Sequence, residues 1–246
     1  CYGMKGNIII KRIFACKRPF MRLISTVFFI CIMLLPATGQ KHFHFLDTPF
    51  EYMKVSGNLH LSLHPSDSTY LEFDVQGFPE SLSLEQERGK LILKSKTELS
   101  QSPAIEFNLH LACLDDLEIS RGAVVQSSDT LRYDVLSIKV ETGGKTEILL
   151  VCDSLNARVS QGSDIILYGS ARSLQVNANT MGNFLAYEFQ ADKAWAKAAT
   201  GSQVKLNVLD LLNANASGAS FIGYLQEPAR KEFKTSLGGK INRRNE

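Results

Sequence analysis

Apolar and polar residues alternate in short runs from about residue 113 to the end of the chain, for example over 147–151, 165–168 and 204–208. Alternation with a period of two is typical of β-strands that bury one side. No stretch is long enough for the crossover helix of a βαβ unit. The pattern therefore predicts strands that follow one another through short turns.

Glycines punctuate these strands at intervals of 17 to 21 residues. They are Gly122, Gly143, Gly162, Gly182, Gly201, Gly218 and Gly238. Glycine adopts positive φ without steric penalty, which tight turns between strands require. A period near 20 residues indicates a stacked repeat architecture with one turn column.

A second series, with a similar period, is mostly leucine: Leu117, Leu136, Leu155, Leu174, Ala194 and Leu212. Two strands and two turns in about 20 residues describe one coil of a β-solenoid, whose inner side chains are buried only when coils stack. At a strand spacing of about 4.8 Å, six or seven coils extend about 30 Å. We therefore predict an all-β chain, a parallel β-helix (β-solenoid) with regular coils over residues 113–246 and a short polar tail.

Residues 40–112 are also rich in candidate strands but lack this period. A solenoid needs its end covered, because an open end exposes strand edges and core. We interpret 40–112 as irregular β-rich first coils together with an N-terminal cap.

The first 39 residues have the features of a leader and signal peptide. Six basic residues and no acidic residue precede and flank the apolar run 23–35, and small residues follow at Ala37 and Gly39. We expect cleavage after Gly39, which leaves no stable membrane span, with an uncleaved anchor as the alternative. Met21 is an alternative start, which would make residues 1–20 an upstream extension.

Removal of the leader changes the charge of the chain. The whole sequence has 27 basic and 25 acidic residues, and the leader holds six of the basic ones, so residues 40–246 carry 21 against 25, a net charge of −4. The chain as a whole therefore offers no electrostatic support for nucleic-acid binding.

An acidic series runs parallel to the leucines: Asp115, Asp134, Asp153, Asp192 and Asp210. Stacked carboxylates could bind Ca²⁺ or act as an acid/base pair. Aspartate is also a favoured turn residue, because its side chain caps nearby backbone N–H groups, and we favour that interpretation. Arg172 interrupts the series and could neutralise Asp153. We expect no cofactor.

Other polar and aromatic residues leave two interpretations each. All five histidines lie between residues 42 and 110, where strand pairs could hold a metal or be ordinary surface residues. Six asparagines between 177 and 215 could form side-chain ladders, which we favour, or a glycan-binding face. Phe184, Tyr187, Phe189 and Trp195 are expected in the core or at coil ends, with sugar stacking as the alternative.

Two cysteines lie outside the leader, Cys113 and Cys152. They occupy similar places two coils apart, so their Cα atoms should be about 9.6 Å apart, twice the strand spacing. A disulfide needs less than about 7 Å. We expect two buried, unpaired thiols.

The order of several motifs resembles a known family. The motifs are the run 50–57, the run 89–93, the turns after Gly122, and the run 221–228. Over about residues 48–240 the chain resembles the putative auto-transporter adhesin head family, or GIN domain, of Gram-negative bacteria. The resemblance implies a right-handed parallel β-helix, related in shape to pectin lyases, and a role in adhesion.

Together these observations predict an exported, non-catalytic binding or adhesion module in the periplasm or on the outer surface of a Gram-negative cell. Its ligand would be a surface glycan or protein rather than nucleic acid. The alternatives are a carbohydrate-active enzyme of pectin-lyase shape and a structural envelope protein without a soluble ligand.

Overall fold

The computed structural model describes residues 42–46, 50–73, 79–96 and 103–244. The interpretation of residues 1–39 as a leader, and Met21 as a start, falls outside these ranges. From residue 40 on, the chain forms one compact unit. The described ranges contain strands and no helix, so a search of them for a long apolar helix able to cross a membrane gives none.

The described residues form sixteen strands, most of them parallel to their neighbours. Their bounds are β1 His42–Phe45, β2 Tyr52–Ser56, β3 Leu59–Pro65, β4 Tyr70–Phe73, β5 Leu82–Glu87, β6 Lys90–Ser95, β7 Ile105–Leu111, β8 Asp116–Ser120, β9 Val124–Val140, β10 Lys145–Val159, β11 Asp164–Ala178, β12 Asn183–Ala198, β13 Gln203–Ala216, β14 Phe221–Tyr224, β15 Arg230–Thr235 and β16 Lys240–Arg243.

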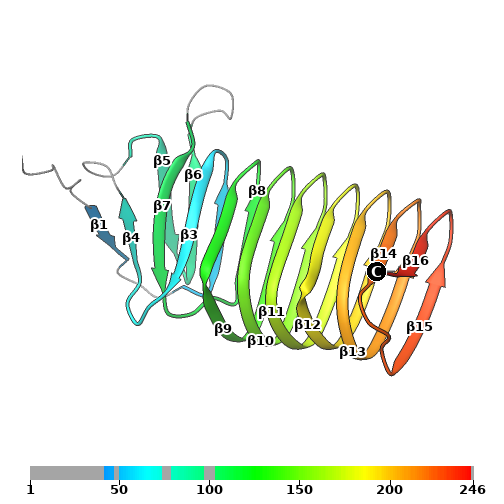
Figure 1. Cartoon of the computed structure of the whole chain (residues 1–246). Helices are drawn as coiled ribbons and strands as arrows, with labels where there is room; N and C mark the ends of the chain where they lie inside the picture. Colours follow the sequence, from blue (N-terminus) through cyan, green and yellow to red (C-terminus); the bar gives the residue numbers. More distant parts are fainter. Residues whose placement is uncertain (1–41, 47–49, 74–78, 97–102, 245–246) are drawn as a thin grey trace, which may run out of the picture. The chain divides into compact units, whose positions relative to one another are not determined.

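The long strands β9 to β13 lie side by side in sequence order, each one pairing in parallel with the next (Figure 1). Lys145 lies opposite Asp164, and Asp164 opposite Asn183, so each of these coils takes 19 residues. The prediction of a β-solenoid is confirmed, with about seven turns of about 19 residues.

Each long strand bends once and so contributes to two faces of the solenoid. The first face holds residues 145–151 of β10, their partners in β9 and β11 to β13, and strands β3, β7, β14 and β16. The second face holds residues 154–159 of β10, their partners, and strands β2, β6, β8 and β15. The two faces meet at a corner near Asp153 and at the turns between strands.

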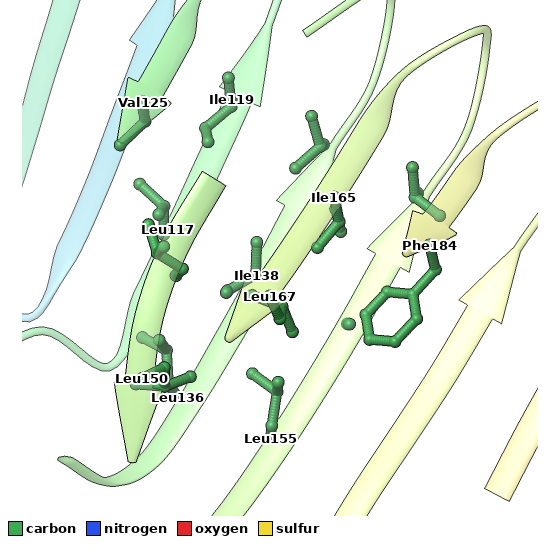
Figure 2. Packing of buried hydrophobic residues seen from close by; sticks show 14 of the residues in the cluster. Leu117, Ile119, Val125, Leu136, Ile138, Leu150, Leu155, Ile165, Leu167 and Phe184 are labelled. Carbon is green, nitrogen blue, oxygen red and sulfur yellow. The ribbon is translucent and has the colours of Figure 1, made fainter. Parts of the chain in front are cut away.

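Inward-pointing side chains from both faces fill the space between them (Figure 2). Leu155 lies opposite Leu136 and Leu174, and the column continues through Ala194 and Leu212, as predicted. Leu117 is buried but lies outside this column, because it pairs with Ile138. Strand β8 follows the irregular N-terminal coils, so the 19-residue period does not set its register.

The N-terminal coils stack out of sequence order. Strand β2 lies between β6 and β8, and β3 lies between β7 and β9. The chain therefore starts one coil inside the stack, runs outward, and returns through β6 and β7. Antiparallel strands then end the parallel stacking, with β5 on β6, β4 on β7 and β1 on β4.

At the other end, strand β15 places polar residues where earlier coils have core residues. Lys231 lies opposite the buried Leu212, and Thr235 opposite the buried Ala216. The Lys231 ammonium pairs with the Glu227 carboxylate. Inward-pointing charge disfavours the addition of another strand at an open edge.

Candidate binding surfaces

The predicted glycine column lies at a row of seven stacked β-turns. In each turn two consecutive residues have positive φ, the combination that a type I′ turn requires. The N–H of Gly144 donates to the carbonyl oxygen of Glu141 at 3.2 Å and so closes one turn. The N–H of Gly143 donates to Gln161 of the next coil at 3.1 Å, which joins neighbouring turns.

Two of the seven glycines lie one residue away from the expected place. The second turn position holds Gly122, Gly143, Gly162, Met181, Gly201, Ala219 and Gly238. Gly182 follows its turn, and Gly218 occupies the first turn position. Gly182 is still required, because a Cβ atom there would lie 2.6 Å from the carbonyl oxygen of Val159.

The third column of the turn was missed in the sequence. After the two positive-φ residues comes a small residue in every coil: Ala123, Gly144, Ser163, Gly182, Ser202, Ser220 and Gly239. Ser202 and Ser220 are buried, and their hydroxyls donate to carbonyl oxygens of the preceding coil, at 3.1 Å to Ala178 and 2.8 Å to Ala198. The signal was the recurring pair of small residues at this period. This edge of the solenoid is structural.

The acidic series lies at the corner between the two faces. Asp134, Asp153 and Asp192 follow one another there, with Arg172 between the last two, and Asp210 lies beside Asp192 at a register shift. Asp115 falls outside the row, because its carbonyl oxygen accepts from the N–H of Ser137, two residues beyond the place that the series predicts.

Arg172 neutralises one carboxylate of this row, as predicted. Its Nε donates to Asp153 Oδ1 at 2.8 Å, and a second guanidinium nitrogen contacts Asp153 Oδ2. The hydrogen bond and charge of Asp153, with smaller contributions from Asp192 and Asp134, raise the pKa of Arg172. Within the described ranges, no aspartate of the series donates or accepts a side-chain hydrogen bond with a backbone group, so turn capping is not what the structure shows.

The histidines gather in a stack of rings on the first face. The ring of His110 stacks on Tyr70 at 4.2 Å and on His64 at 5.0 Å, measured between ring centroids. His64 Nδ1 lies 2.8 Å from Asp129 Oδ2. In the described parts of the chain, no three histidine, cysteine or carboxylate side chains converge in a way that could hold a metal ion.

The asparagines do not form one ladder, because they lie in different columns. Asn183 donates to Asp164 at 2.8 Å, Asn213 donates to Glu232 at 2.7 Å, and Asn207 accepts from Gln226 at 2.7 Å. Each bond joins neighbouring coils, so the amides support stacking in pairs with other polar residues.

The two cysteines are free, as predicted, but they differ in exposure. Cys152 is buried opposite Tyr133, and burial, helped by the charge of Asp153, raises the pKa of its thiol to about 11. Cys113 is exposed, which corrects the expectation of two buried thiols.

The four aromatic side chains also separate. Phe184 and Phe189 are fully buried, as expected, and Tyr187 is partly buried. Trp195 is not in the core: 41% of its surface is exposed on the second face. It lies between Gln175 of β11 and Asn213 of β13.

Charges on the second face are paired near its N-terminal end. Glu118 accepts from the Tyr52 hydroxyl at 2.7 Å and from the Lys54 ammonium at 2.8 Å, and Lys139 lies 3.6 Å away. Burial acts to raise the pKa of Glu118, but the hydrogen bonds from Lys54 and Tyr52 and the two positive charges lower it on balance.

From β10 to β15 the same face has basic residues with no ion-pair partner among the described residues. They are Arg158, Lys193, Lys197, Arg230 and Lys234. The acidic residue that points outward there is Glu232, which accepts the hydrogen bond from Asn213.

An open pocket of about 520 Å³ lies at the end of β3. It is lined by Pro65, Ser66, Asp67, Leu111, Ala112, Thr130, Arg132 and Tyr133. Its lining includes one carboxylate, from Asp67, and no histidine. Burial raises the pKa of Tyr133 to about 12, so its phenol stays neutral. The lining thus lacks the pair of carboxylates typical of a glycoside hydrolase.

Comparison with protein families gives a match over residues 49–228 to the family described as "Putative auto-transporter adhesin, head GIN domain". No curated protein matches the chain.

Solved structures of putative adhesins share the fold. One from Bacteroides fragilis is 18% identical, with a TM-score of 0.73 over 83% of this chain and 96% of that one. One from Parabacteroides merdae is 14% identical, with a TM-score of 0.67 over 84% and 96%. A putative lipid binding protein from Parabacteroides distasonis is 17% identical, with a TM-score of 0.56 over 85% and 98%. At these identities the likeness concerns the fold alone.

Proposed function

The chain belongs to the family described as "Putative auto-transporter adhesin, head GIN domain", and we propose that it is an exported, non-catalytic binding module that acts in adhesion, in the periplasm or on the outer cell surface. The second face carries this proposal. It presents ordered rows of outward amide, basic and aromatic side chains across β10 to β15. Such a rigid, repetitive face suits many weak contacts made in parallel.

The chemistry of the other surfaces supports binding over turnover. A hydrolase or lyase needs acid and base groups that converge in a cleft, with pKa values suited to proton transfer. The corner row instead places its carboxylates on an exposed edge, one of them neutralised by Arg172.

Purified protein, incubated with acidic and neutral polysaccharides and with isolated cell envelopes, tests the proposal. We expect retention on at least one of these surfaces and no release of reducing or unsaturated sugars. The double variant Asp134→Asn with Asp153→Asn should bind as the original chain does. Sugar release that this double variant abolishes would replace the adhesion proposal with an enzyme.

Location is tested separately. Protease treatment of intact cells should degrade the protein if it faces outward, and only lysed cells should allow cleavage if it is periplasmic. Mass spectrometry of the exported protein should find its N-terminus near Gln40. Retention of the apolar run 23–35 would instead indicate a membrane anchor.

A further inference from the structure

Positive charge is concentrated on one part of a chain that is acidic as a whole. Residues 40–246 carry a net charge of −4, from 21 basic and 25 acidic residues. On the second face, from β10 to β15, five basic side chains point outward against the single carboxylate of Glu232. None of the five has an ion-pair partner within the described ranges, whereas Lys54 and Lys139 on the same face are paired with Glu118. An anionic partner would supply the missing counter-charge.

The only tryptophan of the chain lies at the centre of this charged region. Lys193 and Lys197 flank Trp195 along β12, on the same side of the strand and about 6.6 Å from it, twice the rise per residue. Gln175 and Asn213 flank it on the neighbouring strands, at a strand spacing of about 4.8 Å. A flat ring, two ammonium groups and two amides thus share one small, rigid patch.

We infer that this patch, centred on Trp195, binds an acidic polysaccharide; the inference rests on the proposed binding function and names its ligand class. The apolar face of a sugar ring stacks on an indole, which offers flat area and keeps its own N–H available. Carboxylate or sulfate groups pair with the lysines and with Arg158 in charge-assisted hydrogen bonds. Sugar hydroxyls both donate and accept, as the amides do.

The same observations favour a glycan over other anionic surfaces. A lipid surface is held by several apolar anchors together with basic residues, and here a single aromatic residue stands among amides and ammonium groups. Single-stranded nucleic acid is held by successive aromatic platforms along a groove. The patch has one such platform on an open face.

The fluorescence of Trp195 tests the inference directly, because no other tryptophan contributes. Polygalacturonate, alginate and chondroitin sulfate are the acidic probes, and methyl-esterified polygalacturonate and dextran are the neutral ones. We expect at least one acidic probe to shift the emission and to protect it from acrylamide quenching, with no effect of the neutral probes. Raising the salt from about 50 mM to about 500 mM should weaken binding about tenfold or more, since exposed charges are screened.

Variants with matched controls locate the site. Trp195→Ala, and separately Lys193→Gln with Lys197→Gln, should each reduce the affinity for the acidic probe about tenfold or more, measured by calorimetry or affinity electrophoresis. The controls lie on the first face: Tyr168→Ala for the aromatic change, and Lys205→Gln with Lys240→Gln for the charge change. They should stay within about twofold, and circular dichroism should show every variant folded.

The outcomes separate this inference from the proposed function. If no acidic probe perturbs Trp195, or if the second-face variants bind as well as the controls, the inference is wrong, although retention on cell envelopes would leave the adhesion proposal intact. If single-stranded DNA or anionic vesicles bind more tightly than every glycan, with the same dependence on Trp195, the ligand class is wrong. Absence of binding to every surface, together with sugar release, would overturn both.

Discussion

Met181 is the residue at which the turn edge is most strained. It has a φ of 61° at the second turn position, where five other coils have glycine, and 70% of its surface is exposed. The side chain therefore gains little from burial. We predict that Met181→Gly stabilises the protein, although it replaces a larger residue with the one that loses most chain entropy on folding.

The magnitude follows from two opposing effects. A left-handed backbone costs an L-residue about 1–2 kcal/mol, and glycine costs about 0.5–1 kcal/mol in additional chain entropy. The difference predicts a gain of about 0.5–1 kcal/mol for Met181→Gly. The reverse change, Gly162→Ala, should lose a similar amount, because no atom lies within 4 Å of the added Cβ and only the positive φ opposes it.

The adjacent Gly182 provides the contrast, because its constraint is steric. A Cβ there would lie 2.6 Å from the carbonyl oxygen of Val159, so Gly182→Ala should destabilise by about 1–3 kcal/mol. Urea unfolding followed by circular dichroism gives the three midpoints. A lower midpoint for Met181→Gly, or an unchanged one for Gly182→Ala, would refute this account of the turn column.

Three further predictions concern the core, the second face and the thiols. Leu155→Ala should lower the free energy of unfolding by about 2–5 kcal/mol, because the side chain is 1% exposed, and denaturant titration would measure it. The lowered pKa of Glu118 means that its stabilisation is complete above the ordinary glutamate pKa of about 4.3 and is lost as the pH falls through the folded-state pKa. Thermal unfolding between about pH 5 and pH 2 should therefore show a smaller loss of stability for Glu118→Gln than for the original chain. Cys113 should react with Ellman's reagent in the folded protein, whereas Cys152, buried and with a thiol pKa of about 11, should react only after unfolding; equal rates would contradict the difference in exposure.

The period of the chain was sufficient to predict the fold, because one column fixes the others. Once Leu136, Leu155 and Leu174 stack, every second residue on either side must point inward, and the structure follows this from β9 to β13. The sequence could not show where single residues are inserted. Register shifts in β12, between Ala186 and Gln190 and after Ala191, make coils of 18 to 20 residues, so counting from glycine to glycine misplaces Gly182 and Gly218.

The N-terminal coils could not be predicted from the period, for a topological reason. A repeat is visible in sequence only when neighbours in space are also neighbours along the chain. Strand β2 pairs with β6 and β8, which follow it by more than 30 residues, and β1, β4 and β5 run antiparallel to their partners. Each strand still alternates, so the strands were predicted even though their order was not.

The acidic row and Trp195 show how a residue's place depends on its neighbours rather than on its type. Aspartates at a fixed period are expected at turns, yet the strands continue through this corner, and Asp153 pairs with a side chain instead of a backbone N–H. Loops and continuous bends have the same composition, so residue type alone does not separate them.

The exposure of Trp195 could have been deduced from the leucine column. Ala194 occupies that column, so it points inward, and in a strand the next residue must point outward. Because Ala194, Ala196 and Ala198 are small, the hydrophobic pattern of β12 is dominated by its one large residue, which suggests the opposite assignment. Register outweighs hydrophobicity here, since moving Trp195 inward would shift the strand by one residue and bury Lys193 and Lys197. The same alternation that builds the core therefore compels the ring and the two ammonium groups to share the outer face.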